Sequence, residues 1–248
     1  MKGKTALVSG ASRGIGRAVA LELASTGMNL ALLARKPEGL EDLACELMEE
    51  FSIKAVPIAC HCGKENQLRQ AIATVAEKFG QIDILVNNHA TNPHFGWSID
   101  GTAAVFRKIL DTNVVSYFEL ARLCLPLMEK AGGGAIVNIS SVAAKSPAPM
   151  MGFYSISKAA VEHLTRVLAR ELGPKNIRVN AVAPGLVKTD FSKALWSSDE
   201  ILKEVMKTHA IDRIGEPQDV AKLVSFLASS QASYITGAVY TIDGGESI

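Results

Sequence analysis

Long hydrophobic runs, an excess of one charge and a signal-like N-terminus are all missing from this sequence. No apolar run approaches the ~18–20 residues that a membrane-spanning helix needs. Lys and Arg number 26 against 25 Asp and Glu, and a net charge of +1 provides no basic surface for nucleic acid or an anionic membrane. The first residues lead straight into an apolar run ending at Val8, without the segments of a secretory signal. We expect a cytoplasmic protein that binds neither nucleic acid nor membranes.

Cysteine is also scarce. The chain has Cys45, Cys60, Cys62 and Cys124, too few for a disulfide scaffold and without the paired spacing of a zinc site. The Cys60-His61-Cys62 segment contains possible metal ligands, but at a strand end their side chains would alternate between the two faces, and no second pair exists. We therefore expect no metal site, and a reducing compartment.

What the sequence has instead is a regular alternation of short apolar runs and helical patterns, with no linker between them. Runs that are apolar nearly throughout are typical of strands covered on both faces. They are Thr5–Ser9, Met28–Leu33, Ile53–Ala59, Ile82–Val86, Ala135–Ile139, Ile177–Val182 and Ala238–Ile242. Helical segments lie near residues 15–26, 37–51, 64–79, 101–130, 153–172 and 217–228. The alternation predicts an α/β chain of one domain, residues 1–248: a doubly wound Rossmann fold with a seven-stranded parallel sheet and helices on both faces.

The first strand ends in a glycine-rich turn. Ligands of such sheets bind at the carboxyl ends of the strands, so this turn is a candidate site. Glycines let the backbone approach a ligand closely, and the N-terminus of the following helix attracts a phosphate. The spacing is G-x-x-x-G-x-G rather than the general G-x-G-x-x-G fingerprint. The turn predicts a dinucleotide site formed by Gly10, Ser12, Arg13, Gly14, Ile15 and Gly16.

The residues at the end of the second strand indicate whether the dinucleotide is NAD or NADP. NAD-binding proteins carry an acidic residue there for the ribose 2′-hydroxyl, but this chain has Ala34 followed by Arg35. A guanidinium can bind a 2′-phosphate through two hydrogen bonds, and Arg13 lies in the neighbouring turn. Either arginine alone could be a solvated surface charge. The missing acid and the two cations together predict NADP(H).

Polar residues that can do chemistry follow other strands. Tyr154 and Lys158 are four residues apart at the start of a predicted helix, so their side chains share one helix face. Ser141 lies just past the fifth strand, Asn88 follows the fourth, and Asn113 lies in the long helical region between them. An isolated Y-x-x-x-K is a weak signal, but all these elements converge on one edge of the sheet.

With these motifs the chain resembles the short-chain dehydrogenase/reductase family, from Thr5 to Gly245. The resemblance is carried by Gly10/Gly14/Gly16, Asn87-Asn88, Asn113, Ser141, Tyr154/Lys158, Pro184-Gly185 with Thr189, and Asp243-Gly244-Gly245. Segments 92–96, 146–149, 191–196 and 232–237 are similar to the NADPH-dependent carbonyl reductase (dehydrogenase/reductase member 4) group. Bacterial 3-oxoacyl-carrier-protein reductases share the core motifs but match these loops less well.

The resemblance implies a catalytic tetrad. Tyr154 would donate a proton to the developing alkoxide, and Ser141 would hydrogen-bond the same oxygen. Lys158 would bind the nicotinamide ribose and lower the tyrosine pKa, and Asn113 would hold a water that relays protons to it. The resemblance also implies cofactor contacts from His61, Cys62, Asn88, Pro184, Gly185, Val187 and Thr189.

Two departures from the family pattern concern the adenosine and nicotinamide surroundings. The family usually has Asp followed by an aliphatic residue at His61-Cys62, and Ala-Gly at His89-Ala90. His61 could still hydrogen-bond or stack on adenine. We interpret His89 as a pocket-lining or cofactor-edge residue rather than a catalytic base, because Tyr154 and Lys158 fill that role.

The segment 188–213 interrupts the alternation and suits a lid over the substrate. It carries apolar residues among charges: Phe191, Leu195, Trp196, Ile201 and Met206. We expect substrate contacts from Ser141, Phe95, Phe153 and Trp196, in an apolar cleft, although each aromatic could instead belong to a local core.

The function predicted from these residues is NADPH-dependent, reversible reduction of a ketone or aldehyde to an alcohol. One alternative is reduction of a 3-oxoacyl thioester; another, from a different class, is an NADP-binding sensor without turnover. The small-molecule substrate is the expected partner, and the resemblance implies a homotetramer.

Overall fold

The computed structural model describes the backbone of residues 1–248 and every side chain except that of Ile201, so the prediction made for this lid residue lies outside the described residues. In the described chain seven parallel strands form one sheet, in the order β3-β2-β1-β4-β5-β6-β7. The strands are β1 (Thr5–Ser9), β2 (Asn29–Ala34), β3 (Ala55–Ala59), β4 (Ile84–Asn87), β5 (Gly134–Ile139), β6 (Ile177–Pro184) and β7 (Val239–Ile242). The predicted doubly wound fold is confirmed.

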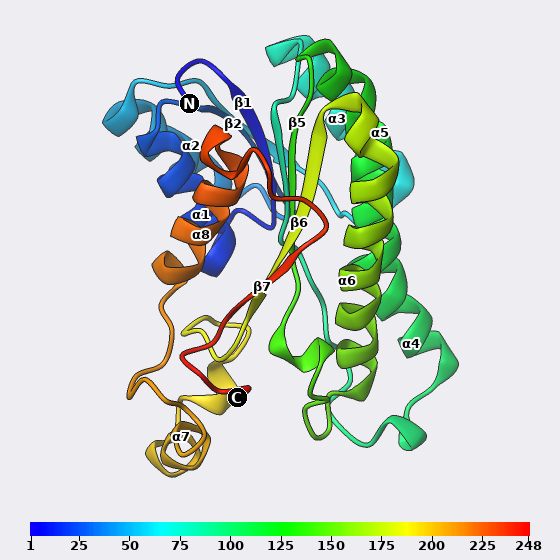
Figure 1. Cartoon of the computed structure of the whole chain (residues 1–248), viewed down its shortest axis with the longest axis vertical. Helices are drawn as coiled ribbons and strands as arrows, with labels where there is room; N and C mark the ends of the chain where they lie inside the picture. The colour runs from blue at the N-terminus through cyan, green and yellow to red at the C-terminus, as the bar shows by residue number, and fades with distance from the viewer.

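Helices cover both faces of the sheet (Figure 1). One layer contains α1 (Gly14–Ser25), α2 (Leu40–Phe51) and α8 (Pro217–Ala228); the other contains α3 (Glu65–Phe79), α4 (Ala103–Leu110), α5 (Ser116–Lys130) and α6 (Gly152–Leu172). The short helix α7 (Asp199–Met206) lies apart from both layers, near the C-terminus.

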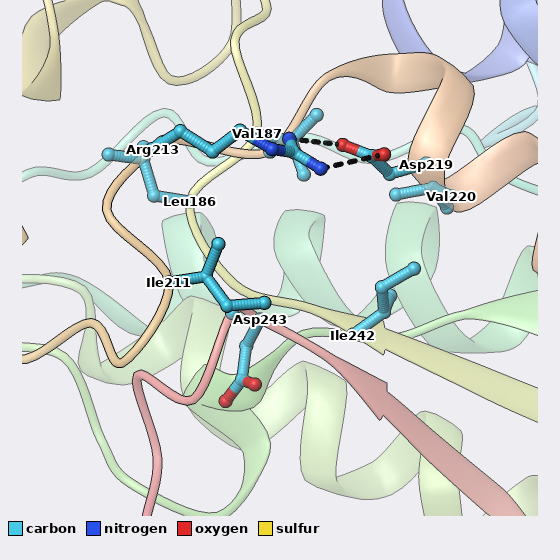
Figure 2. A pocket seen from close by; sticks show the side chains of 10 residues that line it. Leu186, Val187, Ile211, Arg213, Asp219, Val220, Ile242 and Asp243 are labelled. Atoms are coloured by element: carbon cyan, nitrogen blue, oxygen red, sulfur yellow. Dashed lines mark hydrogen bonds and ion pairs between the residues drawn. The ribbon is translucent and has the colours of Figure 1, made fainter.

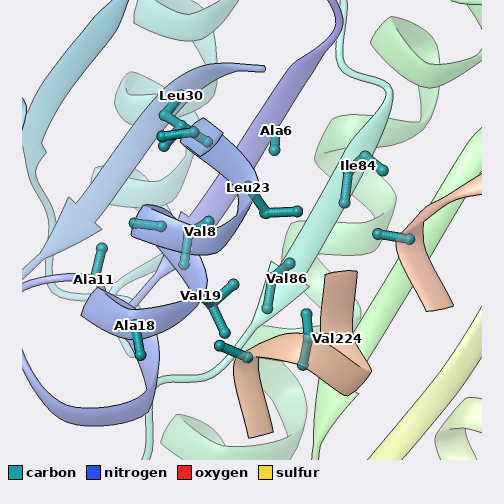
Figure 3. Close-up of a cluster of buried hydrophobic side chains, with 14 of the residues drawn as sticks. Ala6, Val8, Ala11, Ala18, Val19, Leu23, Leu30, Ile84, Val86 and Val224 are labelled. Atoms are coloured by element: carbon teal, nitrogen blue, oxygen red, sulfur yellow. The ribbon is translucent and has the colours of Figure 1, made fainter. Parts of the chain in front are cut away.

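The strands are apolar on both faces because each face has its own core. Val8 and Val86 pack against Val19 of α1 on one side, as Figure 3 shows. The intervening Leu7 and Leu85 join the opposite cluster. Burying each such side chain contributes about 1.5–3 kcal/mol, so the sheet is the rigid centre of the molecule.

Two predicted helices need correction. The segment predicted to begin near residue 37 becomes helical only at Leu40, after Gly39 adopts a left-handed φ of 75°. The segment predicted as one helix over 101–130 consists of α4 and α5 separated by a π-helical turn, Asp111–Val115. This turn carries Asn113, and π-helical turns inside helices occur frequently at functional sites.

The topology determines where a ligand can bind. From β1 the chain runs outward through β2 and β3, then returns to place β4 on the other side of β1. The carboxyl ends of β1 and β4 therefore border a crevice at the switch point. Among the described helices, none is both long and apolar enough to cross a membrane.

Candidate functional site

The glycine turn between β1 and α1 has the shape of a phosphate cradle. Gly10 and Gly14 adopt positive φ angles of 68° and 56°, which favour glycine. A Cβ on Gly16 would overlap the carbonyl oxygen of Gly10. The N-terminus of α1 has no side-chain cap and no acidic residue in its first turn, so its backbone N–H groups are available to an anion. These residues fit the pyrophosphate of a dinucleotide.

Asn88 secures this cradle from the neighbouring strand. Its side-chain nitrogen donates to the carbonyl oxygens of Ser9 at 3.2 Å and Gly10 at 3.1 Å. Its backbone N–H donates to the Ser9 hydroxyl at 3.0 Å. The structure therefore places this predicted cofactor residue behind the turn, where it holds the turn's carbonyls in place.

The two predicted phosphate-binding arginines have different surroundings. Arg13 donates to Asp190, near the start of the segment 188–213, at 3.1 Å, and both side chains are exposed. Arg35 is exposed beside the buried Ala34 and, among the described side chains, forms no ion pair within 4 Å. Arg35, like the adjacent Lys36, is thus an exposed cation without an ion pair at the end of β2 in the described chain, whereas Arg13 has an acidic partner already.

The remaining predicted cofactor residues lie along the same edge. His61 and Cys62 follow β3, and the backbone N–H of His61 donates to Gln67 at 2.7 Å. Pro184 ends β6; Gly185 then donates to Ile242 at 3.1 Å, and Val187 pairs with Gly215. The others are Ser12 and Ile15 in the glycine turn and Thr189, whose methyl carbon faces Gly14.

Tyr154, in the first turn of α6, meets Ser141 from the end of β5. The tyrosine is 8% exposed, and burial raises its pKa to about 12, against a smaller lowering by the nearby Ser141 hydroxyl. Two hydroxyls from separate elements therefore lie close together. That geometry suits binding of a single substrate oxygen.

Lys158 lies beneath Tyr154 on the same helix face. It is 1% exposed, and its ammonium donates to the carbonyl oxygen of Ile139 at 2.7 Å. The Nζ atom is 5.6 Å from the centroid of the Tyr154 ring and 5.4 Å from that of Tyr117. Burial lowers the pKa of Lys158 to about 7, so this lysine can gain and lose a proton near neutrality.

Asn113 reaches this group from the π-helical turn. Its amide nitrogen donates to Ser157 at 3.0 Å, next to Lys158 in α6. The same side chain accepts from the backbone N–H of Thr91 at 2.8 Å and donates to its carbonyl at 3.0 Å. All four predicted tetrad residues thus gather at the carboxyl ends of β4 and β5.

The predicted substrate residues divide into three environments. Phe95 is 63% exposed on the loop after β4. Phe153 is buried and stacks on Phe106 with ring centroids 4.6 Å apart, as a local core residue does. Trp196 folds back onto its own segment, donating to Thr189 at 3.1 Å.

Two aromatic residues outside the predicted site set contact it. Phe191 of the lid lies against the Tyr154 ring, with centroids 5.6 Å apart. Tyr117 supports Lys158 from α5. A Tyr four residues beyond Asn113 on a helix could have signalled the second contact, whereas Phe191 carries no signal beyond its place in the lid.

Two hollows flank this site. One, of about 340 Å³, lies between the glycine turn and the lid and is lined by Arg13, Gly14, Lys188 and Thr189, among others. The other, of about 160 Å³, is shown in Figure 2 beside the Arg213–Asp219 ion pair and contains none of the tetrad. Across the described residues, no three His, Cys, Asp or Glu side chains gather as a metal site requires.

Comparison with known proteins agrees with this arrangement. A family model described as enoyl-(acyl carrier protein) reductase matches residues 10–247. Human dehydrogenase/reductase SDR family member 4 is 43% identical over 242 residues, covering 98% of this chain and 87% of the relative. The chain belongs to the short-chain dehydrogenase/reductase family.

Solved structures of this family share the fold closely. A 7α-hydroxysteroid dehydrogenase complexed with NADH and 7-oxo glycochenodeoxycholic acid has a TM-score of 0.93 at 36% identity, covering 98% of this chain and 94% of that one. L-Sorbose reductase from Gluconobacter frateurii, complexed with NADPH and L-sorbose, also has a TM-score of 0.93, at 30% identity and 99% and 97% coverage. Members of this short-chain dehydrogenase/reductase family thus bind either nicotinamide cofactor, and this chain is an oxidoreductase.

Proposed function

We propose that this oxidoreductase reduces a ketone or aldehyde to an alcohol with NADPH, reversibly, as one catalytic unit over residues 1–248. The observation that carries the proposal is the meeting of Tyr154, Ser141 and Lys158 at the sheet edge that also holds the glycine cradle. The two hydroxyls would bind one substrate oxygen, and the glycine cradle would hold the cofactor that supplies the hydride.

Each tetrad residue has one role in this proposal. Ser141 donates a hydrogen bond to the carbonyl oxygen, and Tyr154 transfers its proton to that oxygen as negative charge develops. Lys158 binds the nicotinamide ribose and holds its proton close to the tyrosine. Asn113 keeps the adjoining turn in place and connects Lys158 to water.

The electrostatics support this division of labour. Burial raises the pKa of Tyr154 to about 12, which keeps it a neutral proton donor, and lowers that of Lys158 to about 7, which lets it exchange a proton near neutrality. When bound, the cofactor supplies the hydride, and its oxidised ring carries a positive charge that favours the phenolate. Tyr154 can therefore give up its proton during reduction and recover it afterwards.

We propose NADP(H) as the cofactor, on Ala34 and Arg35. Ala34 offers no carboxylate to a ribose 2′-hydroxyl, and the exposed Arg35 guanidinium is available to a 2′-phosphate. Arg13 would serve the same phosphate by exchanging its bond with Asp190. The relatives described above include complexes of both cofactors, so this choice rests on the residues at the end of β2.

The substrate we propose is an apolar carbonyl compound under a lid formed by residues 188–213. Phe191, which lies against the Tyr154 ring, exposes 52% of its surface, and Phe95 on the loop after β4 exposes 63%, which favours a hydrophobic ligand. Reduction of a 3-oxoacyl thioester is the second candidate, favoured by the description of the matching family model. A sensor without turnover has no use for the complete tetrad.

We also propose that the protein is a homotetramer and works in a reducing compartment. Apolar side chains on α5, α6 and the π-helical turn remain exposed: Val115, Phe118, Ile156 and Val167. A second copy would cover them. The four cysteines are free thiols in the described chain, as expected in the cytoplasm.

The test follows NADPH absorbance with small ketones, aromatic ketones, diketones and 3-oxoacyl and enoyl thioesters. The proposal expects turnover with an apolar ketone at least about tenfold better in kcat/KM than with either thioester. Thioesters as the better substrates would establish the second candidate. Cofactor binding without turnover of any compound would favour the sensor.

Cofactor choice is tested in the same assay with NADPH and NADH at low and high salt. Charge-assisted hydrogen bonds contribute ~1.5–3 kcal/mol, so NADPH should be preferred by about tenfold or more, and less so as salt rises. The double change Ala34→Asp with Arg35→Ile should shift the preference toward NADH. A wild-type ratio near one, or a ratio that the double change leaves alone, would refute NADP(H) specificity.

A further inference from the structure

His89 occupies a position that the proposed mechanism does not use, between the glycine turn and the π-helical turn. Its Nδ1 atom lies 2.7 Å from the hydroxyl of Ser9, and its Nε2 atom lies 2.6 Å from the hydroxyl of Ser116. Its ring packs edge-on against Tyr117 with centroids 5.0 Å apart. Both imidazole nitrogens of a single side chain thus join two parts of the site.

The neighbouring hydrogen bonds determine the proton arrangement. The Ser116 hydroxyl donates its hydrogen to the carbonyl oxygen of Thr112 at 2.6 Å, so it must accept from Nε2–H of His89. A neutral ring protonated at Nε2 keeps its lone pair on Nδ1, which accepts from the Ser9 hydroxyl at 2.7 Å; the carbonyl oxygen of Val86 is a second and more distant acceptor for that hydroxyl, at 3.2 Å. The Ser9 oxygen accepts from the backbone N–H of Asn88 at 3.0 Å.

This arrangement needs a neutral imidazole. Burial is the main cause that lowers the pKa of His89 to about 3, and the positive charge of Lys158 acts in the same direction. An imidazolium would have to donate from Nδ1 as well, which would turn the Ser9 hydrogen away toward the Val86 carbonyl and lose the bond that Ser9 donates to the ring. The ring is therefore a fixed brace and not a proton carrier.

The hydrogen bonds of His89 end beside two groups that the proposed reaction needs in fixed positions, the glycine turn and Asn113. Ser9 immediately precedes Gly10, whose carbonyl Asn88 also binds. Thr112 immediately precedes Asn113 in the π-helical turn, and its carbonyl oxygen accepts the Ser116 hydroxyl. The Tyr117 hydroxyl donates to the His89 carbonyl at 3.0 Å and so fixes the backbone of His89 as well.

We propose that His89 is a positioning residue that, through Ser9 and Ser116, fixes the cofactor turn and Asn113 relative to each other. The inference rests on the proposed function, because it assigns a geometric role in that reaction. It predicts that the bond to Ser116 matters more for turnover than the bond to Ser9. The glycine turn is held directly by two bonds from the Asn88 side chain, whereas the bond to Ser116 acts beside the turn that carries a tetrad residue, Asn113, which Thr91 also binds.

Two substitutions separate the two bonds. A glutamine side chain places an amide nitrogen near the Nε2 position, so His89→Gln keeps a donor to Ser116. An asparagine places its oxygen near Nδ1, so His89→Asn keeps only an acceptor for Ser9. His89→Ala removes both bonds, and Cys124→Ala is the matched control for loss of a buried side chain, since Cys124 lies further along α5 at 0% exposure.

We expect His89→Ala and His89→Asn to lower kcat by about tenfold or more, with the KM for the carbonyl substrate within about threefold, because misplacement affects the transition state. His89→Gln should recover kcat to within about threefold of the wild type, and Cys124→Ala should leave it unchanged. Adding Ser116→Ala to His89→Ala should cause no further loss, since the bond is already gone. Equal kcat for the Gln and Asn variants would overturn the inference.

A second readout is independent of turnover. Nitrogen-15 NMR of the wild-type protein should show His89 as a neutral ring protonated at Nε2 throughout pH 6–8. A ring protonated at Nδ1, or a charged ring, would overturn the inference. A wild type that reduces no carbonyl compound refutes the proposed function instead, and the NMR result then decides the case for His89 alone.

Discussion

The edge of the sheet and the proposed lid, residues 188–213, meet where Phe191 lies against Tyr154, yet they are built differently. At the edge, Asn113 and Lys158 are almost completely buried, and their polar atoms bond to distant elements. In the lid, Ser192 and Trp196 bond mainly to Val187 and Thr189 of their own segment, and Phe191 is half exposed. Side chains that bond mainly within their own segment can open locally at low free-energy cost. In the proposed mechanism the edge fixes the reacting groups, and the lid adapts to the substrate.

The largest expected effect is at the edge. Tyr154→Phe removes the proposed proton donor while keeping the ring, so kcat should fall by ~10²–10⁴-fold with cofactor binding nearly intact. Steady-state kinetics and a fluorescence titration with NADPH measure the two quantities. Tyr240→Phe, on β7, is the matched control. A Phe variant that keeps more than about a tenth of the wild-type kcat, with chemistry rate-limiting, would exclude Tyr154 as the acid.

The second-largest effect is expected in the glycine turn between β1 and α1. Gly16→Ala places a methyl group against the Gly10 carbonyl, so NADPH affinity should fall by about tenfold or more, and the thermal midpoint should drop. Gly173→Ala is the control, because a Cβ there meets nothing within 4 Å. Unchanged affinity in Gly16→Ala would mean that the turn does not hold the cofactor.

Lys158 makes the edge sensitive to pH in a way that the lid is not. Its folded pKa of about 7 lies below the unfolded value of ~10.4, so between these values the unfolded chain binds the extra proton and wild-type stability rises with pH. The free energy of unfolding of Lys158→Met lacks this rise with pH, which amounts to up to about 1.4 kcal/mol per pH unit in the wild type. The variant should therefore be more stable than the wild type at pH 7 in urea unfolding, and the difference should shrink by pH 9. The exposed Lys130→Met is the control, and an advantage that stays constant would contradict a buried, easily deprotonated Lys158.

The smallest effect belongs to the lid. Trp196→Ala should lower kcat/KM for bulky aromatic ketones by a few-fold and barely change it for small ones, because the lost contact is apolar and remote from the reacting carbon. Trp196→Phe should keep most of the activity. Equal loss on both substrate classes would indicate damage to the cofactor site through Thr189.

The same contrast describes what the sequence could predict. All seven strands follow from apolar runs, because strands covered on both faces leave an unbroken pattern, and their predicted bounds lie within two residues of the observed ones. The glycine turn follows from its spacing after β1. The tetrad follows from a resemblance, since no periodicity distinguishes Ser141 or Tyr154 from other polar residues.

What escaped prediction depends on contacts between distant segments. The π-helical turn at Asp111–Val115 interrupts a pattern that reads as continuous helix. Arg13 pairs with Asp190 far along the chain, and the partner of Phe153, Phe106, has no local signal, although a core role for Phe153 is one of the two alternatives that the sequence leaves open. The bonds of His89 to Ser9 and Ser116 likewise have no local signal.

The central claim is that this edge reduces a carbonyl carbon directly from the nicotinamide. Its most direct test uses NADPH carrying deuterium at both positions of C4, the best ketone of the panel, and mass spectrometry of the alcohol. The account predicts one deuterium on the carbinol carbon in every product molecule formed by the wild type. Product without deuterium at that carbon, or cofactor oxidation without alcohol, would contradict it.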